Sequence, residues 1–249
     1  MAEMYKGNLA GRAGAAQAEL DQGLRSHMLS VYNYMTSGVL LTGISAYLLA
    51  NTSLRDVFFA ESMVRPGHFA PNLLGMIAMF APLGLALFFG MRIHKMSVAT
   101  AQAVFWVFAA VMGVSLASIL LQYTGASVAR VFFISAASFG GLSLYGYTTK
   151  RSLSGFGSFL IMGLIGLLVA SIVNIFLASS ALQFAISVIG VLVFAGLTAY
   201  DTQRIKDLYS ESYDSASLGK LAISGALTLY LDFINLFIML MQLFGQRRE

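Results

Sequence analysis

The chain has 249 residues, of which 58% are hydrophobic and only 10% are charged, whereas an ordinary soluble domain carries about 25% charged residues. This composition excludes a soluble enzyme. The formal net charge of +4 does not indicate a nucleic-acid-binding protein, because the basic residues are scattered along short polar connections and form no dense cluster. Since cysteine is absent, disulfide frameworks, thiolate nucleophiles and zinc–thiolate sites are excluded as well.

Residues 1–27 are polar, rich in Ala, Gly and Gln, and carry charges of both signs, so we expect them to form a solvated tail. The first apolar run begins only around Val31, whereas a cleaved signal peptide needs its apolar core close to the start of the chain. We therefore expect that run to be kept as a membrane span. The chain divides into this tail and a transmembrane domain over residues 28–249.

Long uncharged runs fill most of the transmembrane domain. A helix needs about 20 apolar residues to cross a hydrocarbon core about 30 Å thick. The run 96–129 is read as one helix followed by a loop at 122–127, and the run 152–200 as two helices with a turn near Ser179 and Ser180. The remaining spans are 31–50, 72–91, 131–149 and 221–245. These runs predict an all-α integral membrane protein with a bundle of seven transmembrane helices.

Basic residues near the ends of the spans predict the orientation, because Lys and Arg are retained on the cytoplasmic side. If seven spans alternate in direction, ten basic residues fall on the side of the N-terminus and five on the other side. This asymmetry predicts a cytoplasmic N-terminus. Seven crossings would place Arg247 and Arg248 outside, against the rule, so the last segment either crosses fully or re-enters, and the C-terminal side stays open.

Two of the eleven acidic residues, Asp201 and Asp232, lie within the apolar spans. An ionised carboxylate deep in a membrane helix costs about 2.5 to 3.5 kcal/mol on insertion scales, so such residues usually have a function. The segment 202–208 contains no Gly or Pro and is compatible with further helical turns, which would let antiparallel helices align the two carboxyl groups. A close pair would share one proton and titrate together, which predicts a pH-sensitive latch.

Polar residues share helical faces with the two acids. Thr228 and Asn235 lie at i−4 and i+3 from Asp232, and Thr198 lies at i−3 from Asp201. These three are candidates to support the pair. The stripe that Thr228 and Asn235 form with Asp232 should face protein or water rather than lipid.

Two arginines leave alternatives open. Arg204 follows Asp201 by three residues, a spacing that also permits an ordinary ion pair at a helix end, so a purely structural role for Asp201 stays open. Arg92 closes the second span on the same side of the membrane. It is either a latch partner of Asp201 or a topology anchor that reaches the lipid headgroups.

Paired carboxylates are hard oxygen ligands that suit calcium, but a stable calcium site needs about six to eight oxygens. Asp201 and Asp232 would therefore hold calcium weakly and transiently, as conduction requires. The three histidines, His27, His68 and His94, lie in the tail or in loops, so a zinc hydrolase within the membrane lacks ligands, and serines in the spans lack a base. We expect no enzymatic activity and no resident cofactor.

Three segments of the sequence resemble the Bax inhibitor-1 family, also called the transmembrane BAX inhibitor motif family, especially its bacterial members. They are SLYGYTTKRSLSGFGSFLIMGLIGLLVASIVNIFL at 143–177, GLTAYDTQRIK at 196–206 and LYLDFINLFIMLMQLFG at 229–245. The resemblance covers nearly the whole transmembrane domain. It implies a seven-helix bundle in which the C-terminal helix is central.

The resemblance also implies functions and roles for residues. Asp201 and Asp232 match the positions of a pH-sensing aspartate pair near the cytoplasmic end of the bundle. An arginine of the second helix latches onto this pair in some members, and Arg92 is the candidate here by position. The family is associated with pH-dependent calcium leak, with protection from cell death in eukaryotes, and in some bacteria with modulation of a membrane-bound protease.

Two functional hypotheses follow from the residues and the resemblance. The first is a pH-regulated calcium leak channel or transporter gated by Asp201 and Asp232. The second is a regulatory protein that binds another membrane protein, such as a membrane-bound protease, through residues 1–27. The expected partners are the lipid bilayer, calcium and possible protein partners of this kind, and no nucleic acid.

Overall fold

The computed structural model describes residues 2–61 and 69–248. Its long elements are all helices, which confirms the predicted all-α class. Their bounds are α1 (Ala2–Asn51), α2 (Arg55–Phe58), α3 (Leu73–Arg92), the 3₁₀ turn η1 (Ile93–Lys95), α4 (Val98–Gln122), α5 (Gly125–Thr148), α6 (Ser154–Leu177), α7 (Ser180–Asp207) and α8 (Ser215–Phe244). A short antiparallel hairpin, β1 (Phe59–Glu61) with β2 (Phe69–Pro71), lies between α2 and α3. The predicted loop residue His68 lies outside the described residues.

Six helices of the described chain are long and apolar enough to cross a membrane, namely α3 with η1 and α4 to α8. The structure therefore supports an integral membrane protein with six such helices, one fewer than the sequence count. The helix left out is α1. Its apolar stretch is diluted by polar residues, among them Asn33, Thr36 and Ser37.

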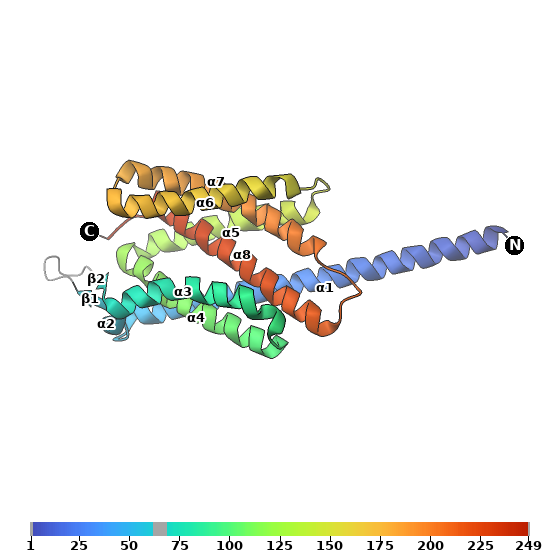
Figure 1. Ribbon diagram of the computed structural model, residues 1–249, viewed down its shortest axis with the longest axis horizontal. Coiled ribbons are helices and arrows are strands. Elements are labelled where there is room, and N and C mark those ends of the chain that lie inside the picture. Colours follow the sequence, from blue (N-terminus) through green and yellow to red (C-terminus); the bar gives the residue numbers. More distant parts are fainter. Residues whose placement is uncertain (1, 62–68, 249) are drawn as a thin grey trace.

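The predicted tail is helical and continuous with the first apolar run, so α1 has 50 residues. Residues 2–27 contain no Pro and six Ala, and Ala favours helix over coil. Figure 1 shows the N-terminal part of α1 extending far beyond the other helices. The remainder of α1 packs along α4 and α8.

Most connections between the spans are short. Ala178 adopts a left-handed backbone with φ of 48° and ends α6, and the Ser179 hydroxyl accepts a hydrogen bond from the Leu182 N–H at the start of α7, as predicted for a turn there. Only Tyr123 and Thr124 separate α4 from α5. The predicted loop at 122–127 is therefore shorter than expected, and the fourth predicted span begins earlier than residue 131.

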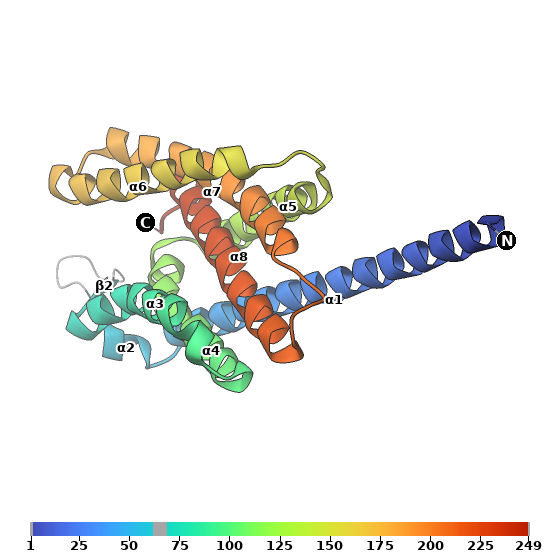
Figure 2. The same ribbon diagram turned by 45° about the vertical axis from the view of Figure 1, so that its right-hand side comes forward.

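The C-terminal helix α8 lies in the middle of the bundle, where it packs against α1, α4, α5 and α7. Figures 1 and 2 both show it, in red, crossing between the pair α3 and α4 and the pair α6 and α7. Of its most apolar 18-residue window 67% is buried, against 11% to 39% in the other five apolar helices. The part of α8 around Asp232 is therefore surrounded by protein.

The end of the chain is attached to the connection between α4 and α5. The Thr124 N–H donates to the Gln246 carbonyl at 2.9 Å, and the Arg248 Nε–H donates to the Tyr123 carbonyl at 3.0 Å. α8 is a continuous helix of 30 residues and does not turn back on itself. The hydrogen bonds made after α8 hold the segment that contains Arg247 and Arg248 against the connection between α4 and α5.

Candidate functional site

The structure brings Asp201 and Asp232 together. α7 continues to Asp207, which confirms the predicted helical extension past Asp201, and α7 packs along α8. Both acids are buried, with 7% and 5% of their surface exposed. Their carboxyl groups are close enough to interact electrostatically. Two acids that are far apart in the sequence thus form one buried pair.

The two carboxyl groups have different neighbours. The Arg204 guanidinium lies 4.0 Å from Asp201 Oδ1, and its side chain is 62% exposed, so solvent screens this ion pair. Asp232 Oδ2 is buried and has no hydrogen-bond partner in the described part of the chain. A buried ionised carboxylate without partners is costly. A negative charge on Asp232 would therefore lack a stabilising hydrogen bond at this oxygen.

A small cavity of about 110 Å³ adjoins Asp201, and its wall also includes Arg204, Thr228 and His27. His27 is buried on α1, and its ring lies 5.5 Å from the ring of Tyr209 between centroids. Burial lowers the pKa of His27 from its ordinary value of 6.5. A further titratable group, contributed by a third helix, therefore faces the site.

His27 is not a predicted site residue, because the polar residues 1–27 were expected to form a solvated tail. His27, Val31 and Met35 are spaced four residues apart and are all buried. That spacing marks one face of a helix. It would have indicated that His27 is buried if the first predicted helix had been extended toward the N-terminus.

A family model described as inhibitor of apoptosis-promoting Bax1 matches residues 24–249. The chain belongs to the Bax inhibitor-1 family. It is 45% identical to the inner membrane protein YbhL of Escherichia coli over 91% of this chain and 94% of that protein. It is 50% identical to an uncharacterised protein of Rickettsia prowazekii over 92% of this chain and 93% of that protein, and 49% identical to an uncharacterised protein of Caulobacter vibrioides over 95% of both.

Family membership, the YbhL relative and the six apolar helices together identify an integral protein of the bacterial inner membrane. The two acids lie inside the matched region of this Bax inhibitor-1 family member, whereas most of the projecting part of α1 lies before it. The buried pair is therefore part of the shared transmembrane domain.

The predicted supporting residues lie near the pair but hydrogen bond within their own helices. The hydroxyl of Thr198 donates to the Phe194 carbonyl at 2.8 Å, and that of Thr228 donates to the Ser224 carbonyl at 3.2 Å. The Asn235 amide donates to the Leu231 carbonyl at 2.8 Å. Among the hydrogen bonds of the described residues, none joins these three side chains to either carboxyl group.

Arg92, the predicted latch, is exposed at the end of α3. Within residues 2–61 and 69–248 no ion pair connects it to Asp201, and Arg204 is the cation that lies near that acid.

A chain of hydroxyl groups links three helices beside Asp201. The hydroxyls of Tyr32 on α1 and Ser143 on α5 are 2.6 Å apart, and Ser143 Oγ lies 3.0 Å from Thr202 Oγ1 on α7. Thr202 in turn donates to the Thr198 carbonyl at 2.7 Å. These bonds hold α1 and α5 to the segment of α7 that carries the acid.

The described ranges contain no cluster of three or more His, Asp or Glu side chains that could hold a metal ion. The pair can offer a cation only the oxygens of two carboxylates, compared with about six to eight oxygens in a stable calcium site. The pair alone therefore supplies too few oxygens for a stable calcium site.

Proposed function

We propose that this protein is a pH-regulated leak pathway for calcium across the inner membrane, gated by Asp201 and Asp232, with neither enzymatic activity nor a resident cofactor. The observation that carries the proposal is the proximity of two buried carboxyl groups on the adjacent helices α7 and α8. Two acids in such a place cannot both ionise without strong repulsion, because the surrounding dielectric is low. The pair therefore couples the position of two helices to proton concentration.

In the closed state the pair shares one proton, with Asp232 as the protonated member because it lacks another partner. Loss of this proton as the pH rises leaves two like charges side by side. Their repulsion separates α7 from α8 at the acid pair, and the ionised carboxylates then attract a cation. Calcium flux should accordingly increase with pH.

The proposal includes seven membrane spans with a cytoplasmic N-terminus, in which α1 supplies the seventh span. α1 buries Val31, Met35, Ala46 and Leu49 against the bundle, and the two ends of the chain lie at opposite ends of the molecule (Figure 1). Because the chain has no cysteine, a single Gln246→Cys variant tests this topology. Its labelling by an impermeant thiol reagent from the cytoplasmic side would contradict it.

Calcium flux into liposomes that contain the purified protein tests the function. We expect wild-type flux to increase over a series of rising pH values. Asp232→Asn, which cannot ionise, should keep flux low at every pH. Asp214→Asn is the matched control, because Asp214 is exposed ahead of the same helix, and it should retain the wild-type pH profile. Equal, pH-independent flux in wild type and Asp232→Asn would defeat the proposal.

A second candidate function is regulation of another membrane protein, such as a membrane-bound protease. The observation that favours it is the projecting part of α1 (Figure 1), which begins before the family match. Deleting residues 2–20 should abolish co-purification of such a partner and leave calcium flux unchanged. If no specific partner co-purifies with the full-length chain, this candidate fails.

A further inference from the structure

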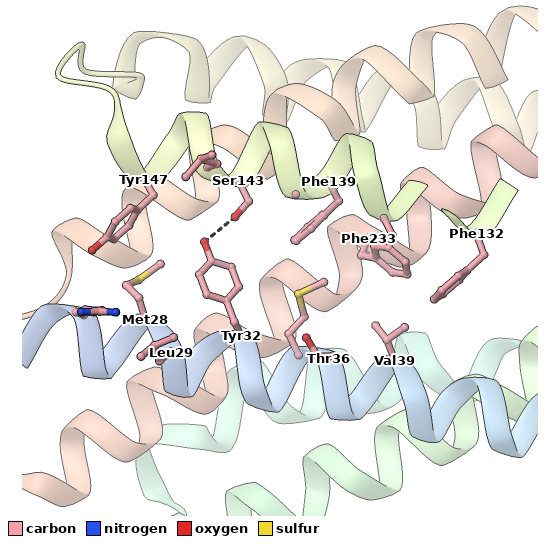
Figure 3. A pocket seen from close by; sticks show the side chains of 15 residues that line it. Met28, Leu29, Tyr32, Thr36, Val39, Phe132, Phe139, Ser143, Tyr147 and Phe233 are labelled. Atoms are coloured by element: carbon pink, nitrogen blue, oxygen red, sulfur yellow. Dashed lines mark hydrogen bonds between the residues drawn. The ribbon is translucent and has the colours of Figure 1, made fainter. Parts of the chain in front are cut away.

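A crevice runs between α1 and α5. α1 packs on α4 and α8, and α5 packs on α7 and α8, so these two helices face each other across α8. The cavity between them has a volume of about 790 Å³, which falls within the range of about 300 to 1,000 Å³ typical of ligand pockets. Figure 3 shows Tyr32 reaching across it from α1 to Ser143 on α5, with Phe139 and Phe233 along its wall.

The wall of the crevice is apolar and its edges face the lipid. Leu29 on α1 and Leu144 on α5 both line the cavity and are 52% and 62% exposed. A second cavity of about 410 Å³ shares Val39, Phe132 and Phe233 with the first and extends it toward Tyr47. The stretch of α1 from Arg25 to Tyr47 measures about 33 Å at 1.5 Å per residue, close to the hydrocarbon thickness of about 30 Å.

Glycines keep the crevice open. Gly140 lines the larger cavity, and Gly43 and Gly125 line the second one. A Cβ atom added at any of the three would meet no atom within 4 Å. If this space were empty, the side chains of its walls would lose dispersion contacts. In a bilayer, an apolar lipid chain can fill the space and restore these contacts.

Positive charge lies at one end of the crevice. Arg25 lines the larger cavity, and the Lys206 ammonium donates to the carbonyl of Tyr147, another lining residue, at 3.0 Å. None of the described residues that line this cavity is acidic. An acyl-sized apolar crevice with cations at one end matches a lipid that carries a negative headgroup, since each basic residue near such headgroups contributes about 1 kcal/mol.

We propose that this crevice is a binding site for an anionic phospholipid, with an acyl chain between α1 and α5 and the phosphate at Arg25. From Arg25 to Val39, α1 extends about 21 Å, which accommodates a headgroup region and the chain of one leaflet. The site is independent of the acid pair, although the Tyr32–Ser143–Thr202 hydroxyls lie between the two. The proposed lipid binding therefore does not depend on the proposed calcium leak.

Native mass spectrometry of the detergent-purified full-length protein tests the site with phosphatidylglycerol and phosphatidylcholine of identical acyl chains. Wild type should bind one phosphatidylglycerol about five-fold or more tightly than one phosphatidylcholine, the factor that one basic residue supplies. Arg25→Gln should reduce this preference about five-fold. Gly140→Leu, which fills the crevice, should weaken binding of both lipids.

Gly141→Leu is the matched control, because Gly141 also has open space around it but does not line the crevice. It should leave both affinities unchanged. If Gly140→Leu fails to fold, as judged by thermal unfolding without lipid, Gly43→Leu fills the continuation of the crevice and takes its place. Equal affinity for the two lipids, or unaltered binding in the filled variants, would overturn the proposal. So would a change in oligomeric mass in the filled variants without loss of lipid, because the occupant would then be a second copy of the chain.

Discussion

Asp201 and Asp232 differ in what stabilises a negative charge on each of them. Asp201 has an arginine 4.0 Å away and adjoins a small cavity, so an ionised form has a counter-charge. Asp232 Oδ2 has no hydrogen-bond partner in the described residues. A buried charge without a partner usually costs several kcal/mol. The protonation state of one acid therefore changes the free energy needed to ionise the other.

His27 gives the folded protein a sensitivity to acid. Because burial lowers the pKa of His27 below 6.5, the unfolded chain binds the proton first, and stability is lost as the pH falls below about 6.5. We expect acidification through this range to lower the Tm less in His27→Asn than in wild type. Thermal unfolding in detergent at several pH values measures this difference.

His94→Asn is the control for that measurement, because His94 is exposed in η1. It should retain the acid-induced decrease in Tm seen in wild type. If His27→Asn shows the same decrease as well, His27 is not the acid-sensitive group.

Two glycines allow neighbouring helices to approach α7 just before Asp201. A Cβ on Gly146 of α5 would collide with the backbone of Ala199, and one on Gly157 of α6 would collide with the ring of Tyr200. Small residues at such positions allow close helix packing in membranes. The approach of α5 and α6 thus fixes α7 at the level of the acid pair.

Gly146→Val should force α5 away from α7. The neighbouring group is backbone and cannot rotate aside, so we expect a loss of about 1 to 3 kcal/mol, the usual range for overpacked interiors. Thermal unfolding in detergent should show a lower Tm. Gly141→Val, on the same helix but with open space around it, should change the Tm much less. Equal effects of the two substitutions would show that helix propensity, and not the contact with Ala199, governs the result.

The distribution of apolar residues predicts much of the architecture but not the way in which the helices meet. The long uncharged runs indicate the helices α3 to α8, and the absence of Gly and Pro in 202–208 predicts the extension that carries Asp201 toward Asp232. The helical tail was missed because polarity alone does not distinguish coil from an exposed helix. The hairpin was missed because each of its strands has three residues, too few for a pattern.

The crevice and the position of His27 depend on contacts between helices that are distant in sequence. Nothing in the one-dimensional pattern states that α1 and α5 both pack on α8 while facing each other across open space. From composition and periodicity alone, the importance of α8 is visible only as an acid in an apolar run, and its central position was expected only from the family resemblance. Its burial on several sides becomes clear once the whole bundle is assembled.

The most direct test of the central claim is a double-mutant comparison of calcium flux in liposomes. Asp201→Asn, Asp232→Asn and the double variant are measured beside wild type across the same pH series. If the two acids act as one unit, each single substitution abolishes the pH dependence and the double variant matches the singles, because residues of one unit are not additive. Retained pH dependence in either single variant, or effects that simply add in the double variant, would contradict a gate formed by the pair.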